Sequence, residues 1–166
     1  MSGPLLLPLA IYLLSFWHYV FYWRAFAFGT ADFDAFKRKA IVLKTISVTA
    51  LALVYLRFPL DPVSLAVIAG GTFLNVRAAM VLGIDRTYYG HEVANLPPQR
   101  ITAFPYSLTA HPMILGNVAA FGGTLLNAGF REQWWPLASL HVAANIGLLA
   151  MELTGPPRRK HKKESR

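Results

Sequence analysis

The chain has 166 residues, of which 55% are hydrophobic and only 14% are charged. Soluble domains carry about a quarter charged residues, so this composition, with a mean hydropathy of +0.41, excludes an ordinary soluble domain and indicates an integral membrane protein. The formal net charge is +8, and there is no cysteine, which excludes disulfides, thiolate metal sites and a cysteine nucleophile.

The first apolar run covers residues 1–29. No basic region precedes it, so we expect a membrane-inserted helix in place of a signal peptide. His18 lies in its aromatic belt, and we interpret it as a packed interfacial histidine. Residues 30–39 are predicted to be a short amphipathic connector on the membrane surface. A second span follows over about 40–56, with Lys44 reaching the interface from its first turn.

The third span is predicted over about 63–83, and its 21 residues would rise about 31 Å, roughly one hydrocarbon thickness. The segment 84–110 is too charged and too rich in proline to cross lipid. Two more apolar runs, about 113–129 and 134–153, are joined by residues 129–133 and should form a helical hairpin.

These runs predict an all-α fold, a polytopic membrane bundle of four to five hydrophobic helices that ends in a helical hairpin. The bundle is expected to be one domain over residues 1–156, followed by a basic tail over residues 157–166. Basic residues at 37–44 and in the tail place the C-terminus and the polar segment in the cytoplasm, with the N-terminus outside. If the first helix dips into the membrane without crossing, four spans remain. The tail should meet anionic lipid, and we expect no nucleic-acid partner.

Ionisable and polar residues inside membrane helices are costly, so they are candidate functional residues. On the third span, Arg77 either reaches the interface or binds an anionic group. The small face with Gly70, Gly71 and Asn75 either packs another helix or lines a cavity.

The last span carries a polar stripe. His141, Asn145 and Glu152 are spaced by four and seven residues, which places them within about 40° of one helix face. Such a stripe should face protein or a water-filled cleft. We interpret His141 as a hydrogen-bonding residue between helices and Glu152 as a site candidate. His111-Pro112 suits the start of a helix, and the histidines have no paired spacing that would indicate a metal site.

Four short motifs occur in one order: FLNVR at 73–77, LGIDRTYYG at 82–90, ITAFPY at 101–106 and HPMILG at 111–116. Together they resemble the integral-membrane phospholipid methyltransferases, in particular the phosphatidylethanolamine and phosphatidyl-N-methylethanolamine N-methyltransferases. The resemblance covers about residues 63–153, and the first two helices match in hydropathy alone. The isoprenylcysteine carboxyl methyltransferases share the His-Pro element and a late glutamate, so they are the sister interpretation.

The resemblance implies S-adenosylmethionine as the methyl donor, bound at the cytosolic face without a Rossmann fold. The family's Gly-x-Gly motif corresponds here to Ala69-Gly70-Gly71, and its late acidic pair to Glu152 alone. The cofactor-binding residues implied in this way, with neighbours on the same motifs, are Ala69, Gly70, Gly71, Asn75, Tyr89, Gly90, His111, Pro112 and Glu152.

The resemblance further implies N-methylation of the amine headgroup of phosphatidylethanolamine or its mono- and dimethyl derivatives, towards phosphatidylcholine, in the endoplasmic reticulum. Glu152 or His111 would accept the amine proton. The residues expected to contact the lipid substrate are Arg77, Arg86, Tyr88, Arg100 and Phe104. The alternatives are an isoprenylcysteine-type carboxyl methyltransferase and a non-enzymatic membrane scaffold or lipid-binding protein.

Overall fold

The computed structural model describes residues 3–154, and this part of the chain contains helices and no strand. The helices are α1 (Gly3–Phe28), α2 (Phe33–Tyr55), α3 (Pro62–Leu82), α4 (Ile84–Thr87), α5 (Gly90–Ala94), α6 (Pro112–Thr124) and α7 (Ala128–Thr154). The predicted all-α fold is confirmed. The predicted basic tail, residues 157–166, lies outside the described residues.

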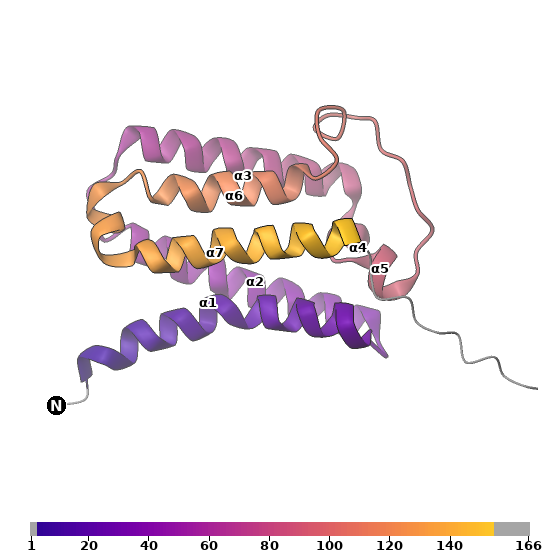
Figure 1. Ribbon diagram of the computed structural model, residues 1–166, viewed down its shortest axis with the longest axis horizontal. Coiled ribbons are helices and arrows are strands. Elements are labelled where there is room, and N and C mark those ends of the chain that lie inside the picture. Colours follow the sequence, from indigo (N-terminus) through magenta and orange to yellow (C-terminus); the bar gives the residue numbers. More distant parts are fainter. Residues whose placement is uncertain (1–2, 155–166) are drawn as a thin grey trace, which may run out of the picture.

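The five long helices lie side by side in the order α2, α1, α7, α6, α3, each packed against the next. Figure 1 shows that α4, α5 and the long connection to α6 gather at one end of the bundle, which we call the loop end. The turns between α2 and α3 and between α6 and α7 lie at the opposite end, which we call the turn end.

The outer surface of the bundle is apolar. Large hydrophobic side chains such as Leu13, Leu53, Phe73 and Met80 are exposed, as expected for a surface that faces lipid. In the described part of the chain, α3 and α7 are long and apolar enough to cross a membrane. These features agree with a helical membrane bundle, and the number of four to five spans stays a prediction.

Two helix boundaries differ from the prediction. The apolar run expected over 113–129 stops being helical at Thr124, and α7 already begins at Ala128, so the expected linker 129–133 belongs to α7. Asn127 explains the early start, because its side-chain oxygen accepts a hydrogen bond from the Phe130 amide at 3.2 Å. An asparagine that binds a free amide of the first turn is a typical helix start.

The second difference concerns the expected surface connector at residues 30–39. Most of it forms the first turns of α2, which begins at Phe33. Asp32 caps this helix by accepting a hydrogen bond from the Ala35 amide at 2.9 Å. The sequence therefore continues as one helix from the connector into the second apolar run.

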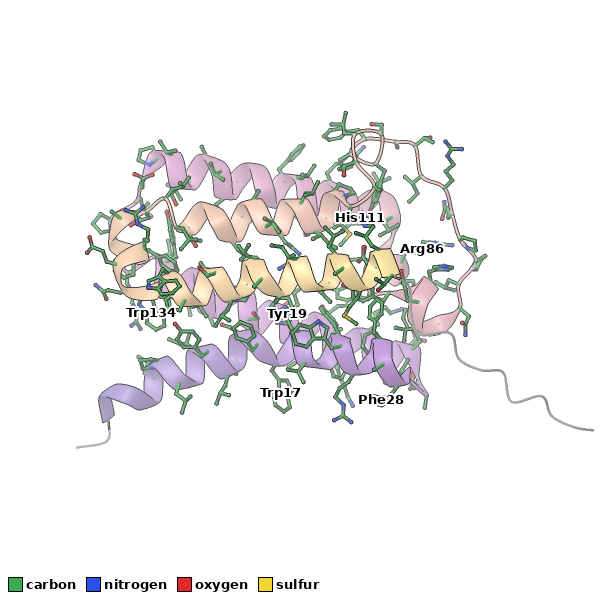
Figure 2. All side chains as sticks on the ribbon, viewed as in Figure 1. Trp17, Tyr19, Phe28, Arg86, His111 and Trp134 are labelled. Atoms are coloured by element: carbon green, nitrogen blue, oxygen red, sulfur yellow. The ribbon has the colours of Figure 1, made fainter. Side chains whose placement is uncertain are left out.

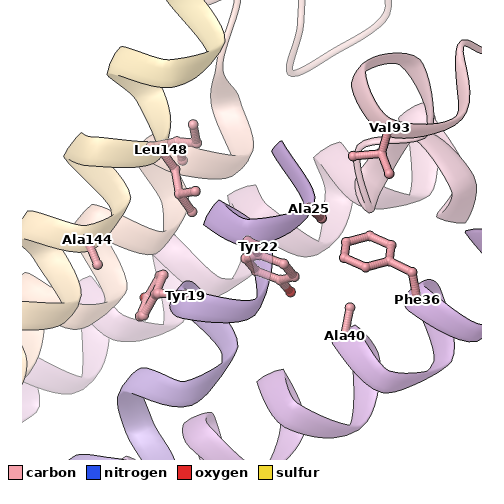
Figure 3. Packing of buried hydrophobic residues seen from close by; sticks show 9 residues of the cluster. Tyr19, Tyr22, Ala25, Phe36, Ala40, Val93, Ala144 and Leu148 are labelled. Atoms are coloured by element: carbon pink, nitrogen blue, oxygen red, sulfur yellow. The ribbon is translucent and has the colours of Figure 1, made fainter. Parts of the chain in front are cut away.

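Buried apolar residues form one cluster at each end. At the loop end, Tyr19 and Tyr22 of α1 meet Phe36 of α2 and Leu148 of α7 (Figure 3). The cluster at the turn end includes Val54, Tyr55, Phe130, Leu137 and Ala138.

Candidate active site

The central contact at the loop end joins His111 and Glu152. His111 precedes the first turn of α6, where its side chain makes no capping hydrogen bond. Its Nδ1 instead lies 2.8 Å from Oε2 of Glu152, in the last turn of α7. Both side chains are partly buried, so the pair is shielded from bulk solvent but still accessible to a ligand. The fold thus unites two candidate residues that are 41 positions apart.

The pair lies on the wall of a cavity of about 300 Å³, within the size range of small-molecule sites. The cavity is lined by α1, α2, α6 and α7 and by the segment between α3 and α6. Of the residues expected to bind cofactor or substrate, it contains Arg86, Tyr88, Tyr89, His111, Pro112 and Glu152. Figure 2 shows His111 and Arg86 together at the loop end, whereas Trp134 lies at the turn end.

Arg86 reaches the cavity from α4. One of its guanidinium nitrogens, Nη2, donates to the Pro97 carbonyl at 3.0 Å. Its Nε is buried and has no hydrogen-bond partner in the described part of the chain. Buried donors are almost always satisfied, so this nitrogen is available to an anionic ligand in the cavity.

Tyrosine rings form much of the remaining wall. Tyr89 adopts the left-handed backbone conformation with φ of 63°, which is unusual for a bulky residue. Its ring is held edge-on against Phe26, with 4.7 Å between centroids, and against Tyr22 at 5.5 Å. A strained backbone that the surrounding packing fixes is frequent at functional sites.

These phenols remain protonated at neutral pH. Burial, followed by the nearby Glu152 carboxylate, raises the pKa of Tyr106 to about 12. Burial is also the main cause that raises the pKa of Tyr88 and of Tyr89. The cavity therefore combines a carboxylate with neutral aromatic rings.

The Gly-x-Gly segment lies away from the cavity. A Cβ atom on Gly71 would lie 2.5 Å from the Ala120 amide nitrogen and 2.6 Å from the Gly116 carbonyl oxygen, so Gly71 lets α3 approach α6 closely. Ala69 and Gly70 are exposed, and a Cβ atom on Gly70 would meet nothing within 4 Å. In this arrangement Gly71 has a packing role, which small residues often have between membrane helices.

Asn75 does not line the cavity, but it is hydrogen-bonded to Asn117, which does. Its side-chain amide donates to the Met113 carbonyl and to Asn117 Oδ1, both at 2.9 Å. Asn117 donates to Asn145 at 3.0 Å, and Asn145 donates to the Tyr19 hydroxyl at 2.8 Å. This chain of hydrogen bonds links α3, α6, α7 and α1, and its members Tyr19, Asn117 and Asn145 line the cavity.

The sequence predicts that His141 forms a hydrogen bond between helices, and the structure agrees. It is fully buried, and its Nδ1 lies 3.1 Å from the Tyr19 hydroxyl.

Four other candidates are not brought into the cavity. Arg77, Arg100 and Phe104 are exposed. Gly90 is buried at the turn between α4 and α5, where a Cβ atom would lie 2.7 Å from the Asp85 carbonyl oxygen. Its role in this structure is to let the chain turn tightly behind Tyr89.

Sequence reasoning assigned no site role to several residues that line the cavity, including Tyr106, His18, Lys44 and Asn117. A signal existed for Lys44, because it is a charge within an apolar run, and for Tyr106, because it closes the ITAFPY motif. The other two residues carry no pattern that separates them from ordinary interface residues.

Comparison with known proteins identifies the same part of the chain. A model of the phospholipid methyltransferase family matches residues 62–154, from the first residue of α3 to the last residue of α7. The match includes the His111–Glu152 pair and three tyrosines of the cavity wall, Tyr88, Tyr89 and Tyr106.

The chain is also similar to the phosphatidyl-N-methylethanolamine N-methyltransferase of Neurospora crassa. The two are 36% identical over 64 residues, which is 39% of this chain and 30% of that protein. No solved structure is significantly similar to the chain. Because the family model covers more than half of the chain and includes the whole paired site of α6 and α7, the chain belongs to the phospholipid methyltransferase family.

Proposed function

We propose that the chain transfers methyl groups from S-adenosylmethionine to the amine headgroup of phosphatidylethanolamine, or of its mono- and dimethyl derivatives, towards phosphatidylcholine. The observation that carries this proposal is the 2.8 Å contact between His111 and Glu152 on the wall of a tyrosine-lined cavity. Both residues lie in the segment that matches the family.

The cavity suits a cationic methyl donor. S-adenosylmethionine, when bound, supplies an electrophilic methyl group on a positively charged sulfur. The neutral rings of Tyr89 and Tyr106 present faces that attract cations, and the Glu152 carboxylate adds negative charge beside them. We assign binding of the donor to Tyr89, His111, Pro112 and Glu152, which all line the cavity.

The chain's own residues must also remove a proton from the amine. A primary amine such as that of lysine has a pKa near 10.4, and lowering it to about 7 costs roughly 4–5 kcal/mol. Transfer from water into the partly buried cavity acts in this direction because desolvation disfavours the ammonium form. With its Nδ1 proton donated to Glu152, His111 offers Nε2 as the proton acceptor, and the carboxylate orients the ring and stabilises its charged form.

Arg86 is the arginine we assign to the lipid phosphate. It lines the cavity with a buried, unpartnered Nε, whereas Arg77 and Arg100 are exposed outside it. A guanidinium matches the geometry of phosphate oxygens well. The acyl chains would stay in the bilayer. The whole bundle would be a single methyltransferase domain with its loop end facing the cytoplasm, in the endoplasmic reticulum by analogy with the family.

The test is transfer of labelled methyl groups into liposomes that contain ethanolamine, monomethyl or dimethyl headgroups, each assayed separately. We expect label in at least one of the three. Absence of label from all three, with correctly inserted protein, would contradict the proposal. Methylation of a farnesylated cysteine analogue in the same assay would instead identify an isoprenylcysteine-type enzyme.

A further inference from the structure

Lys44 of α2 is a charged residue on the cavity wall that the proposed reaction does not use. Its side chain is partly buried and lines the same cavity as His111 and Glu152. It forms no ion pair among the described residues. A charge in a membrane helix that faces a cavity typically marks a substrate or ion path.

His18 of α1 lines the same cavity. It is only 3% exposed, and its Nδ1 is buried without a hydrogen-bond partner in the described part of the chain. The ring is held between Tyr19, with 3.8 Å between centroids, and Tyr22 at 5.5 Å. A fixed, buried imidazole with an unused nitrogen is poorly explained by packing alone.

The register of the two helices brings His18 and Lys44 to one level. The Ser47 hydroxyl of α2 donates to the Ser15 carbonyl of α1 at 2.9 Å. The helices are antiparallel, so one turn from this contact towards the loop end leads to His18 on α1 and to Lys44 on α2. The cavity therefore has two nitrogen-bearing side chains together on its α1–α2 wall.

The wall formed by α6 and α7 carries the Glu152 carboxylate, whereas Lys44 of α2 and Arg86 of α4 bring positive charge to the cavity from other sides. Such a site suits a ligand that carries both a cationic and an anionic group. We propose that Lys44 and His18 form an anion subsite that binds an anionic oxygen group of the ligand while its cationic group lies beside Glu152. The inference rests on the proposed function, in which both ligands have this character: the lipid has a phosphodiester and the methyl donor has a carboxylate.

The test measures equilibrium binding in detergent, which needs no turnover. Each anionic ligand is paired with an analogue that lacks the anion. S-adenosylhomocysteine is compared with its decarboxylated form, and a short-chain phosphatidylmethylethanolamine with a methylamine amphiphile that lacks the phosphodiester. The proteins compared are wild type, Lys44→Met and the control Lys39→Met, which removes an exposed charge on the same helix.

We expect Lys44→Met to weaken binding of one anion-bearing ligand by about tenfold, as loss of a charge-assisted hydrogen bond does, and not to weaken binding of the cationic analogue that lacks the anion. The affected pair identifies the source of the anion, carboxylate or phosphodiester. Lys44→Arg should restore part of the affinity, and Lys39→Met should bind as wild type does. His18→Phe should weaken binding of the same ligand without weakening binding of the analogue that lacks the anion.

Unchanged binding of both anionic ligands to folded Lys44→Met would overturn the subsite. Equal binding by the wild-type protein of each ligand and its analogue without the anion would also overturn the subsite. This outcome needs no variant, so it remains decisive if Lys44→Met does not fold. If the wild type transfers no methyl group but its preference for an anion depends on Lys44, the proposed function is wrong and the subsite stands. If methyl transfer occurs and Lys44 has no effect on binding, the proposed function stands and the subsite is wrong.

Discussion

The two ends of the bundle use their polar groups differently. At the turn end, the Tyr55 hydroxyl donates to Ser64, and Ser64 donates to the Gly123 carbonyl, both at 2.7 Å. At the loop end, Arg86 and His18 keep buried nitrogens without partners beside a cavity. Satisfied groups stabilise the fold, whereas unsatisfied ones are costly and are typically retained for a ligand. The comparison indicates that these turn-end groups hold helices together, whereas the loop end keeps two nitrogens free, among the described residues, beside the cavity.

The same helix contributes to both ends. α7 provides Phe130 and Leu137 to the core of the turn end and Glu152 to the cavity. Substitutions at its two ends can therefore separate effects on stability from effects on activity within one element.

The largest effect is expected for Glu152→Gln. The amide keeps the shape of the side chain but not the charge that orients His111, so kcat/KM should fall by about a hundredfold or more, the lower range for loss of general acid–base catalysis. Glu132→Gln, an exposed acid near the other end of α7, is the matched control and should be neutral. Turnover near the wild-type level in Glu152→Gln would remove the carboxylate from the site.

Gly71→Val should mainly reduce stability. Its Cβ atom would clash with the backbone of α6, and overpacking of this kind costs about 1–3 kcal/mol. The measurement is the thermal unfolding midpoint in detergent, with Gly70→Ala as the control because that position is open. If Gly70→Ala instead weakens binding of the methyl donor at unchanged stability, the Gly-x-Gly segment contacts the donor after all.

Tyr55→Phe tests the turn end. It removes the hydroxyl that donates to Ser64 and should cost about 1 kcal/mol of stability, the usual net value of one hydrogen bond. We expect kcat/KM in liposomes to stay at the wild-type level. A large loss of activity without a loss of stability would contradict the separation of the two ends.

The smallest effect is expected for Tyr106→Phe at high pH. The pKa of Tyr106 is about 12 in the fold, above the ordinary value of 10.0, so the unfolded chain loses this proton first. The contribution of protonated Tyr106 to the free energy of unfolding is complete below pH 10 and declines as the pH rises towards 12. The unfolding midpoint of Tyr106→Phe should therefore fall less than that of the wild type across this range, and parallel curves would contradict the shift.

Helix boundaries were predicted well where the sequence carries a start or stop signal. Proline at the start of α3 and Gly83 at its end bound the third span nearly as expected. His111-Pro112 likewise marks the start of α6. At the α6–α7 turn, apolar residues on both sides hid the boundary, although Asn127 is a recognisable start signal for a helix.

The candidate site was predictable in part. Motifs and the polar stripe of the last helix indicated His111 and Glu152, but their contact depends on how α6 packs against α7. Lys44 and His18, the residues of the proposed anion subsite, were not indicated, because their place on one wall of the cavity follows from the register of α1 against α2. No local pattern encodes that register.

The length of α6 has a consequence for the surrounding lipid. Its 13 residues rise only about 20 Å, roughly 10 Å less than the hydrocarbon core of a bilayer. Close packing of Gly71 against α6 ties this short helix to the longer α3, so it cannot adjust by sliding. Local thinning of the bilayer is one response to such a mismatch. We expect headgroups beside α6 to be drawn inward towards the depth of His111, which in the proposed function would let an aminolipid be modified without leaving its leaflet.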